Sequence, residues 1–192
     1  MKDPPDVTVS FEHFTLHCNA KGQPNNSTYI SWKHYSDNGE CLRSFNGSEF
    51  LTLNSSLTTY MLNGLYVCEA TNGVLNAAES FINSGKHSVQ LQGIPEIMPK
   101  TQLTQYGKYL EPTAVTVFVY SSTPLTWEYT LTNGTKIEDR NLPEQLIKES
   151  IFGKEAYLKG YIITQKISLK EETYFKQLTF YLTNYKGSIR CP

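Results

Sequence analysis

The sequence predicts an all-β protein made of two sandwich domains in tandem. Aromatic residues make up 12% of its 192 residues, including 13 tyrosines, whereas charged residues make up only 18%. This composition suits half-buried strands. Turn signals recur at short intervals and separate short runs in which apolar and polar residues alternate, a pattern typical of a sandwich or barrel. The turn signals are Asn25-Asn26, Asp37-Asn38-Gly39, Asn46-Gly47, Asn63-Gly64, Asn72-Gly73, Ser84-Gly85, Gly93-Ile94-Pro95, Asn133-Gly134 and Lys186-Gly187.

The alternation in the first half assigns side chains to two strand faces. Because successive strand residues point to opposite faces, residues two apart share a face. The apolar sets predicted to point inward are Phe14, Leu16 and Cys18, then Ile30 and Trp32, then Tyr66, Cys68 and Ala70. Their neighbours Thr15, His17, Lys33, Val67 and Glu69 are predicted to point outward.

The inward sets form a longer pattern with fixed spacing. It reads Cys18-x-Ala20-x-Gly22-x-Pro24, then Ile30-x-Trp32, then Gly64-x-Tyr66-x-Cys68-x-Ala70-x-Asn72-Gly73. This pattern resembles an immunoglobulin domain of the intermediate set and covers nearly all of residues 5–91. The resemblance implies that a disulfide joins Cys18 to Cys68 across the two sheets, that Trp32 packs on it, and that Tyr66 makes the corner hydrogen bond.

One position departs from the family. The aspartate usually found six residues before the second cysteine is Leu62 here, so Tyr66 and the neighbouring backbone must hold the corner. The short stretch between Trp32 and Cys68 favours the compact form over a variable-type domain. A bridge that closes a loop of this length stabilises the fold by about 4 kcal/mol in the chain-entropy model.

The second half contains strand-like runs at residues 115–120, 125–129, 161–163 and 178–182. Phe180, followed by Asn184 and Gly187, resembles the spacing of Cys68, Asn72 and the turn after it. Trp127 then matches Trp32, and Val115 or Val117 takes the place of the first cysteine. We therefore expect an immunoglobulin-like sandwich without the disulfide. A fibronectin type III sandwich, which also lacks the bridge, is the alternative.

The expected domains are residues 1–93 and 94–192, joined by a short hinge at Gly93-Ile94-Pro95. Residues 141–159, with Pro143 and Gly153 among them, are expected to form a long strand-poor insertion that contains a short helix.

Two cysteines, Cys41 and Cys191, have no place in the family pattern. Three interpretations stay open: ordinary thiols, a second disulfide between the two, and an intermolecular disulfide. A bridge between them would require the two domains to fold back on each other, because a disulfide tolerates a Cα separation of only about 7 Å.

The sequence offers little to catalyse a reaction or hold a cofactor. His13, His17, His34 and His87 are interpreted as surface histidines; His13 and His17 stand about 13 Å apart on a strand, too far for one metal. Phosphate-binding loops, nucleophile elbows and zinc-protease motifs are missing from the sequence. A net charge of −1 argues against nucleic-acid binding, which needs clustered Lys and Arg. We expect no enzyme, no catalytic or metal-binding residue and no cofactor.

Five glycosylation sequons, together with a disulfide, favour an extracellular glycoprotein. They are Asn25, Asn26, Asn46, Asn54 and Asn133. The chain contains no apolar stretch long enough to span a membrane and no leader after Met1. We therefore expect the native protein to begin before Met1 and to extend past Pro192, with any membrane anchor outside this segment.

The predicted function is protein recognition through one face of the first sandwich. The candidate partner-binding residues are Tyr35, Arg43, Phe45, Val67, Glu69, Val74 and Leu75. The leading hypothesis is the ectodomain of a cell-surface adhesion or immune-type receptor, whose partner is another protein, either a second copy or a cell-surface ligand. The alternatives are a secreted recognition protein for microbial or glycan ligands and a receptor-enzyme fragment. An intracellular muscle-type sandwich shares the pattern but is disfavoured by the bridge and sequons.

Overall fold

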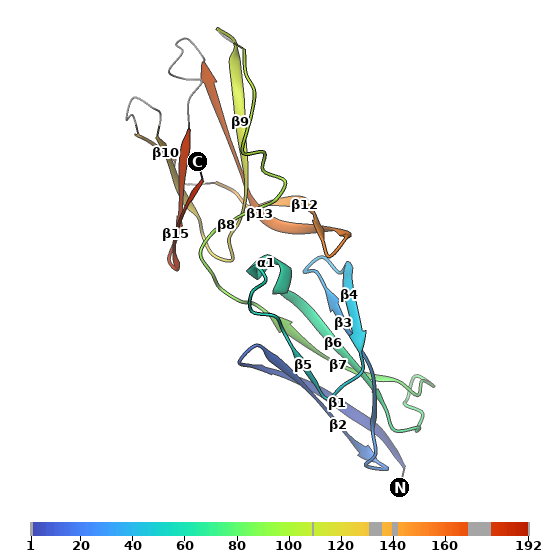
Figure 1. The fold of residues 1–192 in the computed structure, drawn as a ribbon. Helices are drawn as coiled ribbons and strands as arrows, with labels where there is room; N and C mark the ends of the chain where they lie inside the picture. The colour runs from blue at the N-terminus through green and yellow to red at the C-terminus, as the bar shows by residue number, and fades with distance from the viewer. Residues whose placement is uncertain (1, 109, 131–135, 140–141, 169–177, 192) are drawn as a thin grey trace. The chain divides into compact units, whose positions relative to one another are not determined.

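The computed structural model describes residues 2–108, 110–130, 136–139, 142–168 and 178–191. It confirms the predicted fold class: the protein is all-β, with two tandem immunoglobulin-like sandwiches (Figure 1). The chain divides into two compact units. The first comprises residues 1–91 and 150–156, and the second comprises residues 92–149 and 157–192. The domain boundary expected after Gly93 stays a prediction.

The first unit has two antiparallel sheets. One contains, in order, β1 (Asp3–Glu12), β2 (Thr15–Gln23) and β5 (Phe50–Thr52). The other contains β4 (Cys41–Asn46), β3 (Thr28–Tyr35), β6 (Gly64–Thr71) and β7 (Asn83–Val89). A single helical turn, α1 (Thr59–Leu62), precedes β6.

The core of the first unit follows the family pattern. The disulfide between Cys18 on β2 and Cys68 on β6 joins the two sheets. Trp32 is fully buried and lies in register with Cys68. The hydroxyl of Tyr66 donates a hydrogen bond of 2.9 Å to the carbonyl of Leu62. This confirms that the corner is held by Tyr66 and the backbone where the family usually has an aspartate.

Two residues predicted to point inward do not. Phe14 is exposed because His13 and Phe14 form the turn between β1 and β2, both with positive φ. Ile30 is 41% exposed because the register of β3 against β6 shifts between Tyr29 and Ser31. Such a bulge inserts an extra residue and breaks the alternation of side chains.

The remaining strands form two four-stranded sheets, which lie mainly in the second unit. One contains, in order, β12 (Gln145–Ile151), β13 (Lys154–Ser168), β9 (Pro112–Tyr120) and β8 (Glu96–Ile97). The other contains β11 (Lys136–Asp139), β10 (Thr126–Thr130), β14 (Thr179–Asn184) and β15 (Gly187–Cys191).

Packed side chains fill the core of the second unit, where the first unit has its bridge. Trp127, Tyr129 and Phe180 form an aromatic cluster with centroid separations of 5.7–6.2 Å. Val117 and Val119 on β9 are buried against it. The predicted match of Phe180 to Cys68 is wrong by two positions. The residue in register with Trp127 is Leu182, as Cys68 is with Trp32.

The expected strand-poor insertion at residues 141–159 is also wrong. Strands β12 and β13 fill most of it and are joined by a turn at Phe152 and Gly153, both with positive φ. Burial on β13 changes phase between Gly160 and Tyr161, which are both buried. A side chain at Gly160 would come within 2.7 Å of the carbonyl oxygen of Val119. Because of this phase change and of the glycine, the alternation of apolar and polar residues along β13 cannot be recognised in the sequence.

Candidate protein-recognition face

The predicted partner-binding residues belong mainly to the sheet β4-β3-β6-β7. We call its side away from the disulfide the outer face. Cross-strand registers arrange it in rows, because directly opposed residues share a face. The rows are Ser31, Glu69 and Ser84; Lys33, Val67 and Lys86; and Tyr35, Leu65 and Ser88. Tyr35, Val67 and Glu69 therefore lie together on this face, as predicted, and all three are half-buried.

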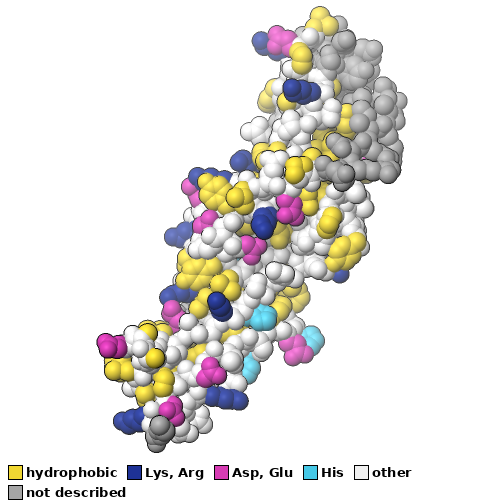
Figure 2. Space-filling view, turned by 180° about the vertical axis from the view of Figure 1, so that it is seen from behind, with side chains coloured by type: hydrophobic (Ala, Val, Ile, Leu, Met, Phe, Trp, Pro, Cys, Tyr) yellow, Lys and Arg dark blue, Asp and Glu magenta, His cyan; other side chains and the backbone are white. Residues whose placement is uncertain are grey.

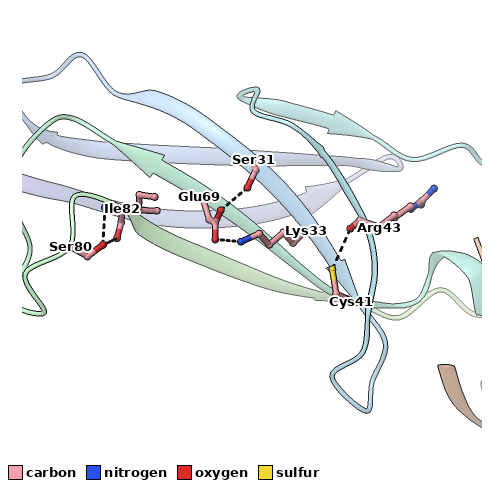
Figure 3. Close-up of polar contacts among 7 residues, drawn as sticks. All are labelled: Ser31, Lys33, Cys41, Arg43, Glu69, Ser80 and Ile82. Atoms are coloured by element: carbon pink, nitrogen blue, oxygen red, sulfur yellow. Dashed lines mark hydrogen bonds and ion pairs between the residues drawn. The ribbon is translucent and has the colours of Figure 1, made fainter. Parts of the chain in front are cut away.

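An ion pair occupies the centre of the outer face. The Lys33 ammonium lies 2.5 Å from a carboxylate oxygen of Glu69, and the Ser31 hydroxyl donates to the other oxygen at 2.6 Å (Figure 3). Burial raises the pKa of Glu69, but the hydrogen bonds from Lys33 and Ser31 outweigh it, so the net pKa is lowered. The hydrogen bond to Glu69 raises the pKa of Lys33. The two charges neutralise each other at neutral pH.

Arg43 and Phe45 were predicted to bind the partner from the segment next to this face, and the structure turns them away from the outer face. On β4 they lie in register with His34 and Trp32, two inward residues. Phe45 packs against the first core, and the Arg43 guanidinium stacks 4.8 Å above its ring. The Arg43 side chain points away from the Lys33–Glu69 pair (Figure 3). The register of β3 against β4 shifts between His34 and Tyr35. As a result, Arg43 pairs with the inward His34 and not with the outward Tyr35.

His34 was predicted to lie on the surface, and this prediction is wrong because the side chain is buried. It is fully buried, stacks on Tyr66 at 4.1 Å between ring centroids, and lies 3.0 Å from the carbonyl oxygen of Asn63 through Nε2. Burial lowers its pKa from 6.5 to about 4, aided by Arg43 and partly opposed by the hydrogen bond to Asn63. The side chain is therefore a neutral imidazole at neutral pH that donates to Asn63. Its place two residues after Trp32 was the signal that could have revealed its inward orientation.

The loop between β6 and β7 presents apolar side chains beside the outer face. Of the two predicted residues, Val74 is half-buried and Leu75 is 49% exposed. Phe81, 55% exposed, and Ile82, 44% exposed, were missed because they fit no strand pattern. Figure 2 shows hydrophobic side chains gathered among charged ones at the lower left, the end of the first unit where this loop lies.

Four of the five sequons lie at exposed asparagines: Asn25, Asn26, Asn46 and Asn54. Asn133 lies outside the described residues. Asn46 stands in register with Ser31, at the end of β4, and β4 is the first strand of its sheet. A glycan there would stand at the β4 side of the outer face. It would leave the β6–β7 side and its loop open.

The two remaining cysteines have different environments. Cys41 is an exposed free thiol at the start of β4, and its sulfur contacts the Arg43 carbonyl oxygen at 4.0 Å (Figure 3). Cys191 is buried in the second core, where burial raises the pKa of its thiol. Cys41 forms no disulfide in this structure, so pairing between these two is not observed. Intermolecular pairing stays a prediction.

The described part of the chain contains no helix long and apolar enough to cross a membrane. Within the same ranges, no group of three or more His, Cys, Asp or Glu side chains is placed to hold a metal ion.

The chain was compared with known proteins. No protein-family model matches it, and no curated protein matches it either. Among solved structures it is similar to the titin Ig tandem domains A164-A165, with a TM-score of 0.53 and 14% identity, over 99% of this chain and 94% of that one. Weaker likenesses are to the titin I-band fragment I67-I69, at a TM-score of 0.34 and 16% identity, and to its E-to-A variant, at 0.37 and 15%. Each covers 99% of this chain and 64% of the other. The first likeness supports the tandem immunoglobulin-like fold and says nothing of compartment or partner.

Proposed function

We propose that the chain is a non-enzymatic recognition module outside the cell, part of the ectodomain of an adhesion or immune-type receptor, and that its outer face binds another protein. Tandem immunoglobulin-like sandwiches commonly serve as protein-interaction modules. The observation that carries the proposal is the composition of the outer face and the β6–β7 loop. Apolar side chains flank an ion pair that neutralises itself.

The chemistry of this surface favours a protein partner. Interface cores are depleted in unpaired charge and enriched in aromatic residues. Tyr35 and Val67 lie next to the neutralised Lys33–Glu69 pair. In contrast, the surface has no cluster of basic side chains of the kind that binds nucleic acid, since Lys86 is the only other basic side chain in the three rows.

The disulfide and the sequons support an extracellular location. Structural disulfides persist in oxidising compartments and are rare in the cytosol. The Cys18–Cys68 bridge joins the two sheets, and four sequon asparagines are exposed, as attachment of a glycan requires. The intermediate-set assignment for the first sandwich is supported by the short connection between Trp32 and Cys68, which holds β4, β5 and α1.

A cell-binding titration tests the proposal. The glycosylated chain, assembled into fluorescent tetramers so that weak contacts add up, should bind a panel of cells saturably and lose binding after protease treatment of the cells. Tyr35→Asp and Val74→Asp should each reduce binding at least about tenfold, because each introduces a charge that must be desolvated in the interface. Thr8→Asp, on an exposed position of β1 in the other sheet, is the matched control.

Unchanged binding by the Tyr35 and Val74 variants would contradict the assignment of this face. Binding that resists protease but is lost after removal of cell-surface glycans would instead favour the secreted glycan-recognition alternative.

A further inference from the structure

A segment with opposite charges at its two ends runs from the β6–β7 loop into β7. It begins at Glu79 in the β6–β7 loop, continues through Phe81 and Ile82, and ends at Lys86 on β7. Lys86 lies opposite Val67 and Ser84 lies opposite Glu69, so both point outward. Ile82 stands two residues before Ser84, in phase with them. We call residues 79–86 the charged strip.

The loop end of this strip is held in one conformation by its own hydrogen bonds. The Asn76 side-chain oxygen accepts from the backbone N–H groups of Ala78 and Ser80, and its amide donates to the Ile82 carbonyl. Ser80 Oγ donates to the Ile82 carbonyl and accepts from its N–H (Figure 3). Phe81 and Ile82 are nevertheless about half exposed. An ordered loop that presents apolar side chains loses little entropy on binding.

Within the described part of the chain, the two end charges are not paired with a charge of opposite sign. Among the described residues, neither the Glu79 carboxylate nor the Lys86 ammonium takes part in any of the ion pairs. The midpoint between positions 79 and 86 falls at Ile82 and Asn83. Two copies of the strip laid antiparallel about a two-fold axis would, in sequence order, pair Glu79 of each copy with Lys86 of the other, with Ile82 and Asn83 at the middle of the pairing.

We propose that the partner of this surface is a second copy of the chain, bound through the charged strip in an isologous, antiparallel contact. The inference rests on the proposed recognition function and names its partner. Self-complementarity requires the same patch to carry both signs, and Glu79 and Lys86 supply them. With the Lys33–Glu69 pair, the surrounding face carries two acids and two bases, so like-charge repulsion between copies is small.

The contact uses the face of β7 and not its edge. Gly85 lies opposite the inward Cys68, and a Cβ atom on it would come within 2.5 Å of the carbonyl oxygen of Val7, so β1 packs against the inward side of β7, opposite to the outer face. The Asn46 sequon stands on β4, the strand farthest from β7 in the sheet, and a glycan there leaves the strip accessible.

Sedimentation velocity of the glycosylated chain in a Cys41→Ser background, which excludes disulfide-linked dimers, tests the proposal. From about 5 to about 500 µM, the mean mass should rise towards that of two chains. The expected dissociation constant is about 10–100 µM, because so small an interface is weak. Ile82→Asp should abolish the rise. Glu79→Lys or Lys86→Glu alone should weaken association at least about tenfold, because each creates two like-charge contacts in a symmetric dimer.

The double variant Glu79→Lys with Lys86→Glu should restore association to within about threefold of wild type, because it re-creates both pairs with exchanged signs. Asp6→Lys and Lys21→Glu are matched controls. They change net charge equally at exposed, mutually paired positions of β1 and β2, and should leave association unchanged.

Three results would each overturn the proposal. The wild-type chain could stay monomeric throughout this range, or the Glu79→Lys and Lys86→Glu variants could each associate as strongly as wild type. The double variant could also associate as weakly as the two single variants. If the monomeric chain still binds cells through Tyr35 in the titration above, the recognition function stands and only the identity of the partner as a second copy fails.

Discussion

At the scale of single residues, the buried group around His34 shows the strongest electrostatic effect in the first unit. His34 lies between the ring of Tyr66 and the carbonyl of Asn63, and the positive charge of Arg43 helps burial to lower the pKa of His34. Because burial holds the folded pKa of His34 near 4, the unfolded chain binds more protons between that pH and 6.5. Stability contributed by the neutral imidazole is therefore fully present above about pH 6.5 and is lost as the pH falls towards 4.

This shift predicts acid sensitivity of the first unit. At pH 5, about 1.5 units below the pKa of an unfolded histidine, the free energy of unfolding should be about 2 kcal/mol lower than at pH 7.5. In a Trp127→Phe background, Trp32 is the sole tryptophan of the chain. Its fluorescence in a urea titration therefore reports the unfolding of the first unit. His34→Gln should remove most of the pH difference, and His13→Gln, at an exposed turn, should keep it. Equal wild-type stability at the two pH values would refute the neutral assignment.

A second prediction at this scale concerns the corner hydrogen bond. Tyr66→Phe leaves the Leu62 carbonyl without its 2.9 Å donor in a buried site, so it should lower the free energy of unfolding by about 1–2 kcal/mol. Tyr106→Phe, at a side chain 90% exposed, should change stability by less than about 0.5 kcal/mol. The same urea titration measures the effect of Tyr66→Phe. Thermal unfolding of the whole chain measures the effect of Tyr106→Phe. Two equally small effects would mean that the corner is held by something else.

At the scale of strands, the bulge in β3 constrains the end of β4. A Cβ atom on Gly47 would lie 2.0 Å from the carbonyl oxygen of Tyr29 and 2.6 Å from the carbonyl carbon of Ile30, where the register of β3 shifts. Only a glycine fits against the bulged backbone. The bulge in β3 turns Ile30 outward. It also requires Gly47, the middle residue of the Asn46 sequon, although Gly47 is distant from β3 in the sequence.

The prediction at this scale is that Gly47→Ala costs about 2–3 kcal/mol of unfolding free energy, since backbone must move to relieve the overlap. Gly39→Ala is the comparison. Gly39 has φ +89 and open space around it, so that variant should cost only the conformational strain of about 1 kcal/mol. Urea unfolding followed by Trp32 fluorescence compares the two. A Gly47→Ala protein no less stable than Gly39→Ala would show that β3 relaxes freely.

Sequence reasoning succeeded where side-chain alternation was unbroken. Leu16, Cys18, Trp32, Tyr66 and Cys68 keep strict spacing within their strands, so their burial was predictable, and the disulfide was implied by the family that their pattern resembles. It failed at shifts in phase, because one extra residue reverses the face of every side chain beyond it.

The failures on the candidate face have the same origin. Arg43 and Phe45 follow the register shift beside Tyr35. Phe81 and Ile82 lie in a loop shaped by side-chain hydrogen bonds of Asn76 and Ser80, which leave no periodic trace in the sequence.

At the scale of the whole molecule, two sandwiches of one architecture are stabilised differently. The first has a disulfide between its sheets, and the second packs Trp127, Tyr129, Phe180 and Leu182 in a core without a disulfide. A bridge that closes a loop with a sequence separation of 50 residues contributes about 4 kcal/mol by restricting the unfolded chain. That is a large fraction of the stability of a typical domain. The first sandwich is therefore suited to an oxidising compartment, which agrees with the proposed extracellular recognition.

Hydrogen exchange with and without a reductant tests this account most directly, because it reports both units in one sample. On reduction, amides of β6 should lose about 4 kcal/mol of protection, while those of β14 in the second core keep theirs. If the protection of β6 did not change on reduction, the claim that Cys18–Cys68 stabilises the first sandwich would be wrong. If β14 lost as much protection as β6, the claim that the second sandwich folds without a bridge would be wrong.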